Sequence, residues 1–148
     1  MDELDRRILD LLIEDGRLSF AEIGRRLAIS RAHARDRTAS LQSRGVIEQF
    51  TAVVNPEKVG VGISAFVDAK VAPTLVETLC AELATLSEVV SLYLMSDMRS
   101  LHIHTLTHTE ADLDAFVREH FFAREGVLSI DCTLLLRRIK NRRGGPRI

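Results

Sequence analysis

The sequence predicts an α+β protein with an N-terminal winged helix-turn-helix domain and a C-terminal ferredoxin-like βαββαβ domain. Two observations lead to this prediction. Residues 1–45 contain three short helical patterns separated by capping residues and glycines, and two β-α-β patterns of similar length follow from residue 63. We expect a helix-turn-helix domain over residues 1–48, a linking strand and hinge over 49–62, a ferredoxin-like domain over 63–138 and a basic tail over 139–148.

The composition is that of an ordinary globular chain, with 148 residues of which 46% are hydrophobic and 28% charged. No apolar run approaches the roughly 18 residues of a membrane helix. Charged residues follow Met1, where a signal peptide would be apolar. Cys80 and Cys132 are the only cysteines, which excludes a disulfide framework and a zinc finger. We therefore expect a cytoplasmic protein.

Apolar spacing and capping residues predict the first two helices. Gly16 is placed to end the first helix, whose apolar residues recur at helical spacing: Leu4, Ile8, Leu11 and Leu12. A capping box formed by Ser19 and Glu22 then opens a second helix of about two turns, with Ile23 and Leu27 on its buried side.

The third helix begins after a turn of only two residues, Ala28 and Ile29. Ser30 is its expected N-cap and Gly45 its expected end. Two helices joined so closely cross steeply and leave the second one on the surface, which is the helix-turn-helix geometry. The expected buried positions are Ala34, Thr38 and Leu41. The surface positions are mostly basic or small: Arg31, Ala32, His33, Arg35, Asp36 and Ala39.

Four segments of the second half are predicted strands, at residues 63–71, 88–95, 101–107 and 127–138, and the first of them alternates apolar with polar residues. A β-prone segment at residues 46–54, which we predict to be the linking strand, precedes them. Two capping boxes open the helices between the four strands: Thr74 with Glu77, and Thr109 with Asp112. This succession predicts a sheet with both helices on one face.

The other face of that sheet would be left uncovered. Four residues expected there do not suit a uniformly solvated surface: Ser91, Tyr93, Thr105 and Thr133. Domains of about 60 to 80 residues also bury only about 60% of their unfolded surface. We therefore expect the chain to self-associate through the sheet.

Charges are strongly segregated along the chain. Residues 63–136 carry four basic and eleven acidic side chains, whereas residues 137–148 carry six basic and no acidic ones. Within residues 17–44, seven arginines stand against only Glu22 and Asp36. Such a basic surface favours an anionic partner, and a solvated basic face is the alternative.

Three histidines lie close together in the sequence: His102, His104 and His108. Strand alternation puts His102 and His104 on one face, at a spacing that could hold a metal ion. No cysteine or carboxylate lies at a complementary spacing nearby, so we expect neither a metal site nor a cofactor.

An ordered set of short motifs spans residues 4–60: Leu4-Asp5-x-x-Ile8-Leu9, Asp15-Gly16-Arg17, Ile29-Ser30, Arg37, Leu41, Gly45-Val46-Ile47 and Asn55-Pro56-x-x-x-Gly60. With these motifs and their spacing, the chain resembles the leucine-responsive regulator (Lrp/AsnC) family of transcription regulators. The βαββαβ remainder is similar to the regulatory domain of that family, so the resemblance covers essentially the whole chain.

The resemblance implies a sequence-specific transcription regulator, not an enzyme, that forms a homodimer and assembles further into a tetramer or octamer. Its recognition helix would enter the major groove of double-stranded DNA. We expect base contacts from Arg31, His33 and Arg35, and Ala32 lies on the same surface. The remaining candidates would meet phosphates or hold the fold: Arg25, Ser30, Arg37 and Arg44.

Four positions depart from the family pattern. Ala28 stands where the family commonly has a glycine in the turn, and Thr38 where it commonly has an apolar residue. Alanine in a left-handed conformation costs about 1 kcal/mol, so we expect the turn to be slightly reshaped and not lost. The other two departures, Ser96 and Arg99, lie in the loop between the second and third strands.

This effector loop typically reads Gly-x-x-Asp in the family and here reads Ser96-Asp97-Met98-Arg99. Arg99 replaces the acidic residue that helps to receive an amino acid, which argues against a free amino acid as effector. The loop then either holds an anionic ligand through Arg99 or takes no small ligand, with Arg99 a solvated turn residue.

Two other functions remain open from the sequence. Siroheme decarboxylases share this two-domain arrangement, and Arg99, His102 and His104 are of types that hold a carboxylated tetrapyrrole. A stand-alone interaction module is the other alternative, against which the arginines of the helical domain argue. The basic tail would add phosphate contacts or serve as a solubilising terminus.

Overall fold

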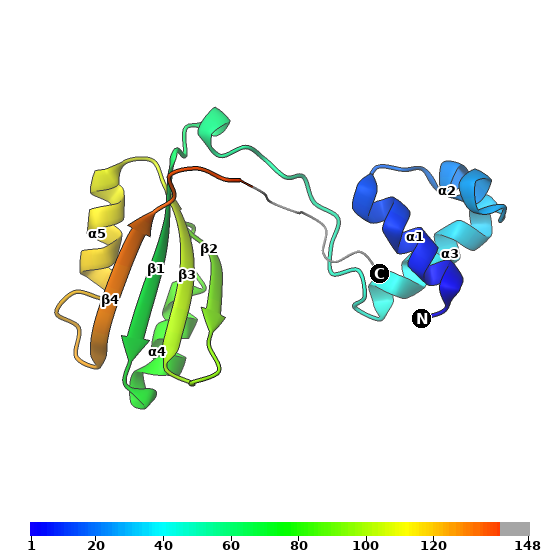
Figure 1. The fold of residues 1–148 in the computed structure, drawn as a ribbon. Coiled ribbons are helices and arrows are strands. Elements are labelled where there is room, and N and C mark those ends of the chain that lie inside the picture. Colours follow the sequence, from blue (N-terminus) through cyan, green and yellow to red (C-terminus); the bar gives the residue numbers. More distant parts are fainter. Residues whose placement is uncertain (140–148) are drawn as a thin grey trace. The chain divides into compact units, whose positions relative to one another are not determined.

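The computed structural model describes residues 1–139, so nearly all of the predicted basic tail lies outside the described residues. The chain divides into two compact units, one containing Met1–Val53 and the other Val54–Arg138. Figure 1 shows the elements of both units. Among the described residues, no helix combines the length and apolar character that crossing a membrane requires.

Three helices make up the first unit: α1 (Glu3–Glu14), α2 (Phe20–Leu27) and α3 (Arg31–Ser43). Their shared core consists of Ile8, Leu9, Ile23, Ala34 and Leu41. Thr38 is buried beside them, and its hydroxyl donates to the carbonyl oxygen of Ala34 at 2.8 Å. This bond satisfies a polar group at a position where an apolar residue is usual. The predicted buried faces of the three helices are confirmed.

The predicted helix boundaries around α2 and α3 are confirmed. The Ser19 hydroxyl accepts from the Glu22 amide at 3.1 Å, and the Ser30 hydroxyl accepts from the His33 amide at 3.0 Å. Gly45 follows α3 with φ +69°, a conformation that favours glycine. The capping box at Ser19 forms in one direction only. The Glu22 carboxylate does not accept from the Ser19 amide, because it accepts from two arginines instead.

The turn between α2 and α3 depends on Gly24, a residue that the sequence analysis did not single out. Ala28 adopts the left-handed conformation (φ 56°, ψ 41°), so the turn is kept without a glycine there. The Gly24 carbonyl oxygen accepts from the amides of both Ala28 and Ile29. A Cβ at Gly24 would lie 2.7 Å from the Ile29 carbonyl oxygen, closer than folded proteins allow. Gly24 therefore lets the chain turn back directly onto α2.

No strand forms over residues 46–54, so the predicted linking strand is wrong for the single chain. The wing of the predicted winged helix-turn-helix domain is absent with it among residues 1–62. A strand requires a neighbouring strand for its backbone hydrogen bonds, and the sheet of the second unit pairs only its own four strands. A 3₁₀ helix, η1 (Glu57–Val59), and Gly60 with φ +82° lie in the predicted hinge.

The second unit is a four-stranded antiparallel sheet with the strand order β2-β3-β1-β4. Helices α4 (Pro73–Leu83) and α5 (Glu110–His120) lie on one side of it (Figure 1). The strands are β1 (Ile63–Val71), β2 (Val89–Leu94), β3 (Ser100–Thr107) and β4 (Val127–Leu134). The predicted βαββαβ fold is confirmed, although β4 ends earlier than the predicted residue 138.

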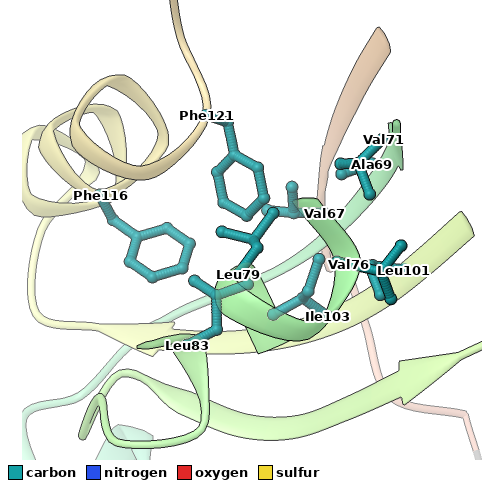
Figure 2. Close-up of a cluster of buried hydrophobic side chains, with 10 residues drawn as sticks. All are labelled: Val67, Ala69, Val71, Val76, Leu79, Leu83, Leu101, Ile103, Phe116 and Phe121. Carbon is teal, nitrogen blue, oxygen red and sulfur yellow. The ribbon is translucent and has the colours of Figure 1, made fainter. Parts of the chain in front are cut away.

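The core of the second unit lies between the sheet and the two helices. Figure 2 shows Phe116 and Phe121 beside α4 residues Leu79 and Leu83 and the strand residue Val67. Burial of each large apolar side chain contributes about 1.5–3 kcal/mol. Every second residue of β3 is buried, so the strand gives one face to this core and leaves the other face open.

Two predictions about the second unit are wrong in detail. The Thr74 capping box does not form, because Pro73 already occupies the first turn and Ala72 precedes the helix without a side-chain cap. Thr105 does not lie on the open face: it alternates with His104, is fully buried on the helix side and donates to the Ala65 carbonyl oxygen at 3.3 Å. The capping box at Thr109 is confirmed in both directions.

We predict that Gly24→Ala destabilises the helical unit. The backbone clash outweighs the gain of roughly 1 kcal/mol from alanine in a helix, so the free energy of unfolding should fall by about 1–2 kcal/mol. Chemical denaturation followed by circular dichroism measures this. Gly62→Ala is the matched control, because Gly62 has open space around its Cβ position and no positive φ; equal stability of the two variants would contradict the prediction.

Candidate nucleic-acid interface and sheet face

The N-terminal part of α3 presents an exposed surface of basic and small side chains. Arg31, Ala32, His33 and Arg35 are all exposed. Within residues 1–139, the side chains of Arg31 and His33 make no ion pair or hydrogen bond, and Arg35 pairs only with its neighbour Asp36 at 2.8 Å. The predicted base-contacting residues are thus all exposed near the start of α3, with Arg31 and Arg35 on one flank of the helix and His33 on the other.

The first turn of α3 strengthens the positive character of this surface. It contains no acidic residue, as in α4, whereas the first turns of α1, α2 and α5 each contain at least one. The amides at a helix N-terminus carry a partial positive charge that favours anions. The cap of this end is the uncharged Ser30 hydroxyl. Neither the cap nor the first turn of α3 therefore places a carboxylate beside the positive end of the helix.

Two arginines of α2 share one carboxylate. The nearest nitrogens of Arg25 and Arg26 both lie 2.7 Å from the same Glu22 oxygen. Hydrogen bonds from Arg25 and then Arg26 lower the pKa of Glu22 to about 2. Because two guanidinium groups face one carboxylate, this part of α2 keeps a net positive charge on the surface.

Arg37 and Arg44 are arranged differently, because both approach the buried Asp5 of α1. The Asp5 carboxylate is 4% exposed and lies 3.5 Å from Arg37 Nη1 and 3.6 Å from Arg44 Nη1. Arg37 also bonds to Asp2, whose pKa is lowered first by the Asp5 amide and then by Arg37. We call Asp5, Arg37 and Arg44 the Asp5 clamp. It fastens the middle and the C-terminal end of α3 to the start of α1.

The predicted effector loop is a tight hairpin closed by its own aspartate. The Asp97 carboxylate accepts from the Arg99 amide at 3.1 Å, from the Ser100 amide at 2.8 Å and from the Ser100 hydroxyl at 2.6 Å. These bonds, led by the one from the Ser100 side chain, lower the pKa of Asp97 to about 2. Ser96 and Met98 are exposed, and Met98 adopts a positive φ of 59°. The only carboxylate of the loop is therefore engaged within the loop.

Arg99 is the remaining charged side chain of this hairpin. It is half-buried, and its guanidinium enters no ion pair with any part of the chain that the structure describes. Its carbonyl oxygen accepts from the Val71 amide at 3.0 Å, which fixes the backbone of Arg99 at the end of β1. The loop thus offers a positive charge, and no free carboxylate, to a ligand.

The face of the sheet opposite the helices carries stacked rings that we call the sheet cluster: Phe66, Tyr93, His102 and His104. The Phe66 ring centroid lies 4.7 Å from that of His104 and 5.3 Å from that of His102. Tyr93 stacks on His102 at 6.4 Å and is 56% exposed. The cluster forms a partly apolar surface over three neighbouring strands.

Both histidines of the sheet cluster already have a polar partner. His102 Nδ1 lies 2.7 Å from an Asp68 oxygen, and His104 Nε2 lies 2.8 Å from the Ser64 hydroxyl. Over residues 1–139 there is no group of three side chains suited to hold a metal ion. His108 points elsewhere, to the Gly60 carbonyl oxygen. The three histidines therefore do not come together.

Comparison with known proteins agrees with both units. Residues 1–42 match the family profile of the AsnC-type helix-turn-helix domain, and residues 64–144 match that of the Lrp/AsnC ligand binding domain. An uncharacterised HTH-type transcriptional regulator of Pyrococcus abyssi is 35% identical over 91% of this chain and 85% of its own length. HTH-type transcriptional regulator Ptr1 of Methanocaldococcus jannaschii is 33% identical over 95% of each chain.

Solved structures show the same fold over the full length. A transcriptional regulator of Neisseria meningitidis, crystallised as a complex with L-Met, has a TM-score of 0.89 at 26% identity and covers 99% of this chain and 96% of its own. An AsnC family regulator of Agrobacterium tumefaciens has a TM-score of 0.86 at 26% identity, with 99% of this chain and 97% of its own covered.

The fold and the α3 surface define a helix-turn-helix transcription regulator with a separate ligand-binding domain. More particularly, the chain belongs to the Lrp/AsnC family, whose members bind DNA, form oligomers and in some cases bind a ligand. The matched families and named relatives are regulators and not enzymes. The siroheme decarboxylase alternative therefore finds no support.

We predict that Asp5→Asn lowers the free energy of unfolding by about 2 kcal/mol, because it leaves the partly buried Arg37 without its buried counter-charge. Thermal or chemical unfolding of the purified variant measures this. Asp36→Asn is the matched control, since the exposed pair between Asp36 and Arg35 is worth at most about 1 kcal/mol. An Asp5→Asn variant as stable as Asp36→Asn would show that the clamp does not hold α1 to α3.

Proposed function

We propose that α3 is the recognition helix of a sequence-specific DNA-binding regulator and that its N-terminal face reads bases in the major groove. The observation that carries this proposal is the exposure of Arg31, His33 and Arg35 around the start of a helix whose first turn contains no acidic residue. An arginine can donate two hydrogen bonds to a guanine, and the small Ala32 lets the helix approach closely.

The other candidate residues divide into two roles. Ser30 caps α3, and the 74%-exposed Arg25 can turn from Glu22 to a phosphate, which leaves both suited to the DNA backbone. Arg37 and Arg44 belong to the Asp5 clamp, which supports a role in holding α3 in place. They would affect DNA binding mainly through the position of the recognition helix.

We further propose that two copies pair through the open sheet face. The sheet cluster offers exposed aromatic surface there, and the helices of the same unit leave that face uncovered. A two-fold dimer would present two copies of α3 to major grooves about 34–36 Å apart or a multiple of this. Tetramers or octamers would be assemblies of such dimers. We place the protein in the cytoplasm, with the DNA that it regulates.

For the effector, we propose an anionic small molecule held by Arg99 in the loop Ser96-Asp97-Met98-Arg99. Support comes from the free charge of Arg99 and from Asp97, whose carboxylate is engaged within the hairpin. The related Neisseria protein binds L-Met, and the ammonium group of such a ligand would meet a positive charge here. A change of DNA affinity on adding carboxylate or phosphate compounds, but not L-methionine, would support this choice.

The first test is fluorescence anisotropy with labelled DNA from upstream of the protein's own gene and a scrambled control. We predict that Arg31→Ala weakens specific binding by roughly 5- to 150-fold, as expected for about 1–3 kcal/mol per lost base contact, without changing unfolding. Arg37→Ala should lower both DNA affinity and stability. Arg118→Ala on α5 is the control for charge alone. Failure of the unmodified protein to bind either DNA at low salt would overturn the proposal.

The second test concerns self-association. We predict that Tyr93→Glu shifts the protein toward monomers in sedimentation velocity, because it places a charge within the paired faces where the cost of burial is several kcal/mol. Phe122→Glu is the matched control, since Phe122 is also exposed but follows α5 outside the sheet. If Tyr93→Glu and Phe122→Glu associate alike, the sheet face is not the interface.

A further inference from the structure

His104 lies in the middle of the open sheet face. On β3 it stands opposite Phe66 of β1 and opposite Ser91 of β2, and Thr133 of β4 continues the same row beyond Phe66. Its ring stacks on Phe66, and its Nε2 is bonded to the Ser64 hydroxyl. A second copy that covers this face would enclose the imidazole almost completely.

The charged groups around His104 do not favour a protonated ring. Burial lowers the pKa of His104, and the positive charges of Arg138 and His102 lower it further. The nearest carboxylate in the neighbouring row, Asp68, is bonded to His102, and Asp131 stands opposite Asp68 on the far side. The other titratable groups on these strands are Lys70, Tyr93 and Cys132, and Cys132 stands opposite Val67. The hydrogen-bond partner of His104 is the uncharged Ser64 hydroxyl.

We propose that protonation of His104 weakens the association of two chains through the sheet face, so that assembly responds to acidification. This inference rests on the proposed sheet dimer and adds that pH controls its formation. The proposed effector site at Arg99 plays no part in this pH dependence. DNA affinity would fall together with assembly wherever binding requires two copies of α3.

The sign follows from solvation. Covering the face removes water from His104, which disfavours its charged form, so its pKa is lower in the dimer than in the monomer. Association is then strongest above the pKa of the monomer and is lost as the pH falls toward the pKa of the dimer. With two His104 side chains per dimer, the dissociation constant rises by up to roughly 100-fold per pH unit within that window.

The experiment is sedimentation velocity of the full chain from about pH 8 to about pH 5.5, with circular dichroism at each pH to confirm folding. We expect the dimer dissociation constant to rise at least about tenfold. His104→Gln, which cannot be protonated, should remove this dependence. His108→Gln, an exposed histidine outside the sheet cluster, should keep it, and His104→Asn serves if the glutamine variant does not fold.

Three results would overturn the inference, and they are distinguishable. A dimer whose dissociation constant does not change with pH rejects the proton link and leaves the sheet dimer standing. A pH dependence that persists in His104→Gln assigns it to another group. Absence of dimers at every pH rejects the sheet dimer itself. Independently of any variant, NMR titration should show a His104 pKa that falls as the protein concentration rises through the dissociation constant.

Discussion

Two helices cover only one face of a four-stranded sheet, and this one-sided burial is the constraint on which the rest of the second unit depends. Residues that alternate along β1 and β3 supply the core with Val67, Ile103 and their neighbours. The intervening residues are left to face solvent or a partner. Because they include stacked rings and a partly buried hydrogen bond between His104 and Ser64, this second face has the aromatic character that is common in interfaces.

In the helical unit, two separate contacts hold α3 and thereby divide its arginines into two groups. The close approach at Gly24 fixes the start of α3, and the Asp5 clamp fixes its middle and C-terminal end. Arginines engaged in the clamp act on the fold, whereas Arg31 at the start of the helix has its guanidinium free. The basic residues that the sequence places on α3 therefore have two roles: some hold the helix in place, and others remain exposed for a partner.

Local signals in the sequence predicted most of the fold because they describe local interactions. The caps at Ser30 and Thr109 and the alternation along β1 and β3 are of this kind. Predictions failed where a neighbouring or distant residue determines the structure. Residues 46–54 have no partner strand, and Pro73 begins α4 so that Thr74 cannot cap it. Thr105 alternates with His104 along β3 and therefore lies on the buried side of the sheet. Gly24 was missed because its constraint comes from Ile29 on the returning chain, although a glycine within a short amphipathic helix was a signal that could have marked it.

In the proposed assembly, the open sheet face joins two chains so that two recognition helices bind one DNA site. The most direct test is the stoichiometry of the complex with an operator duplex, measured by mass photometry beside a duplex that contains only one half-site. We expect an even number of chains on the full operator and much weaker binding to the half-site. A single chain bound with undiminished affinity to either duplex would contradict it.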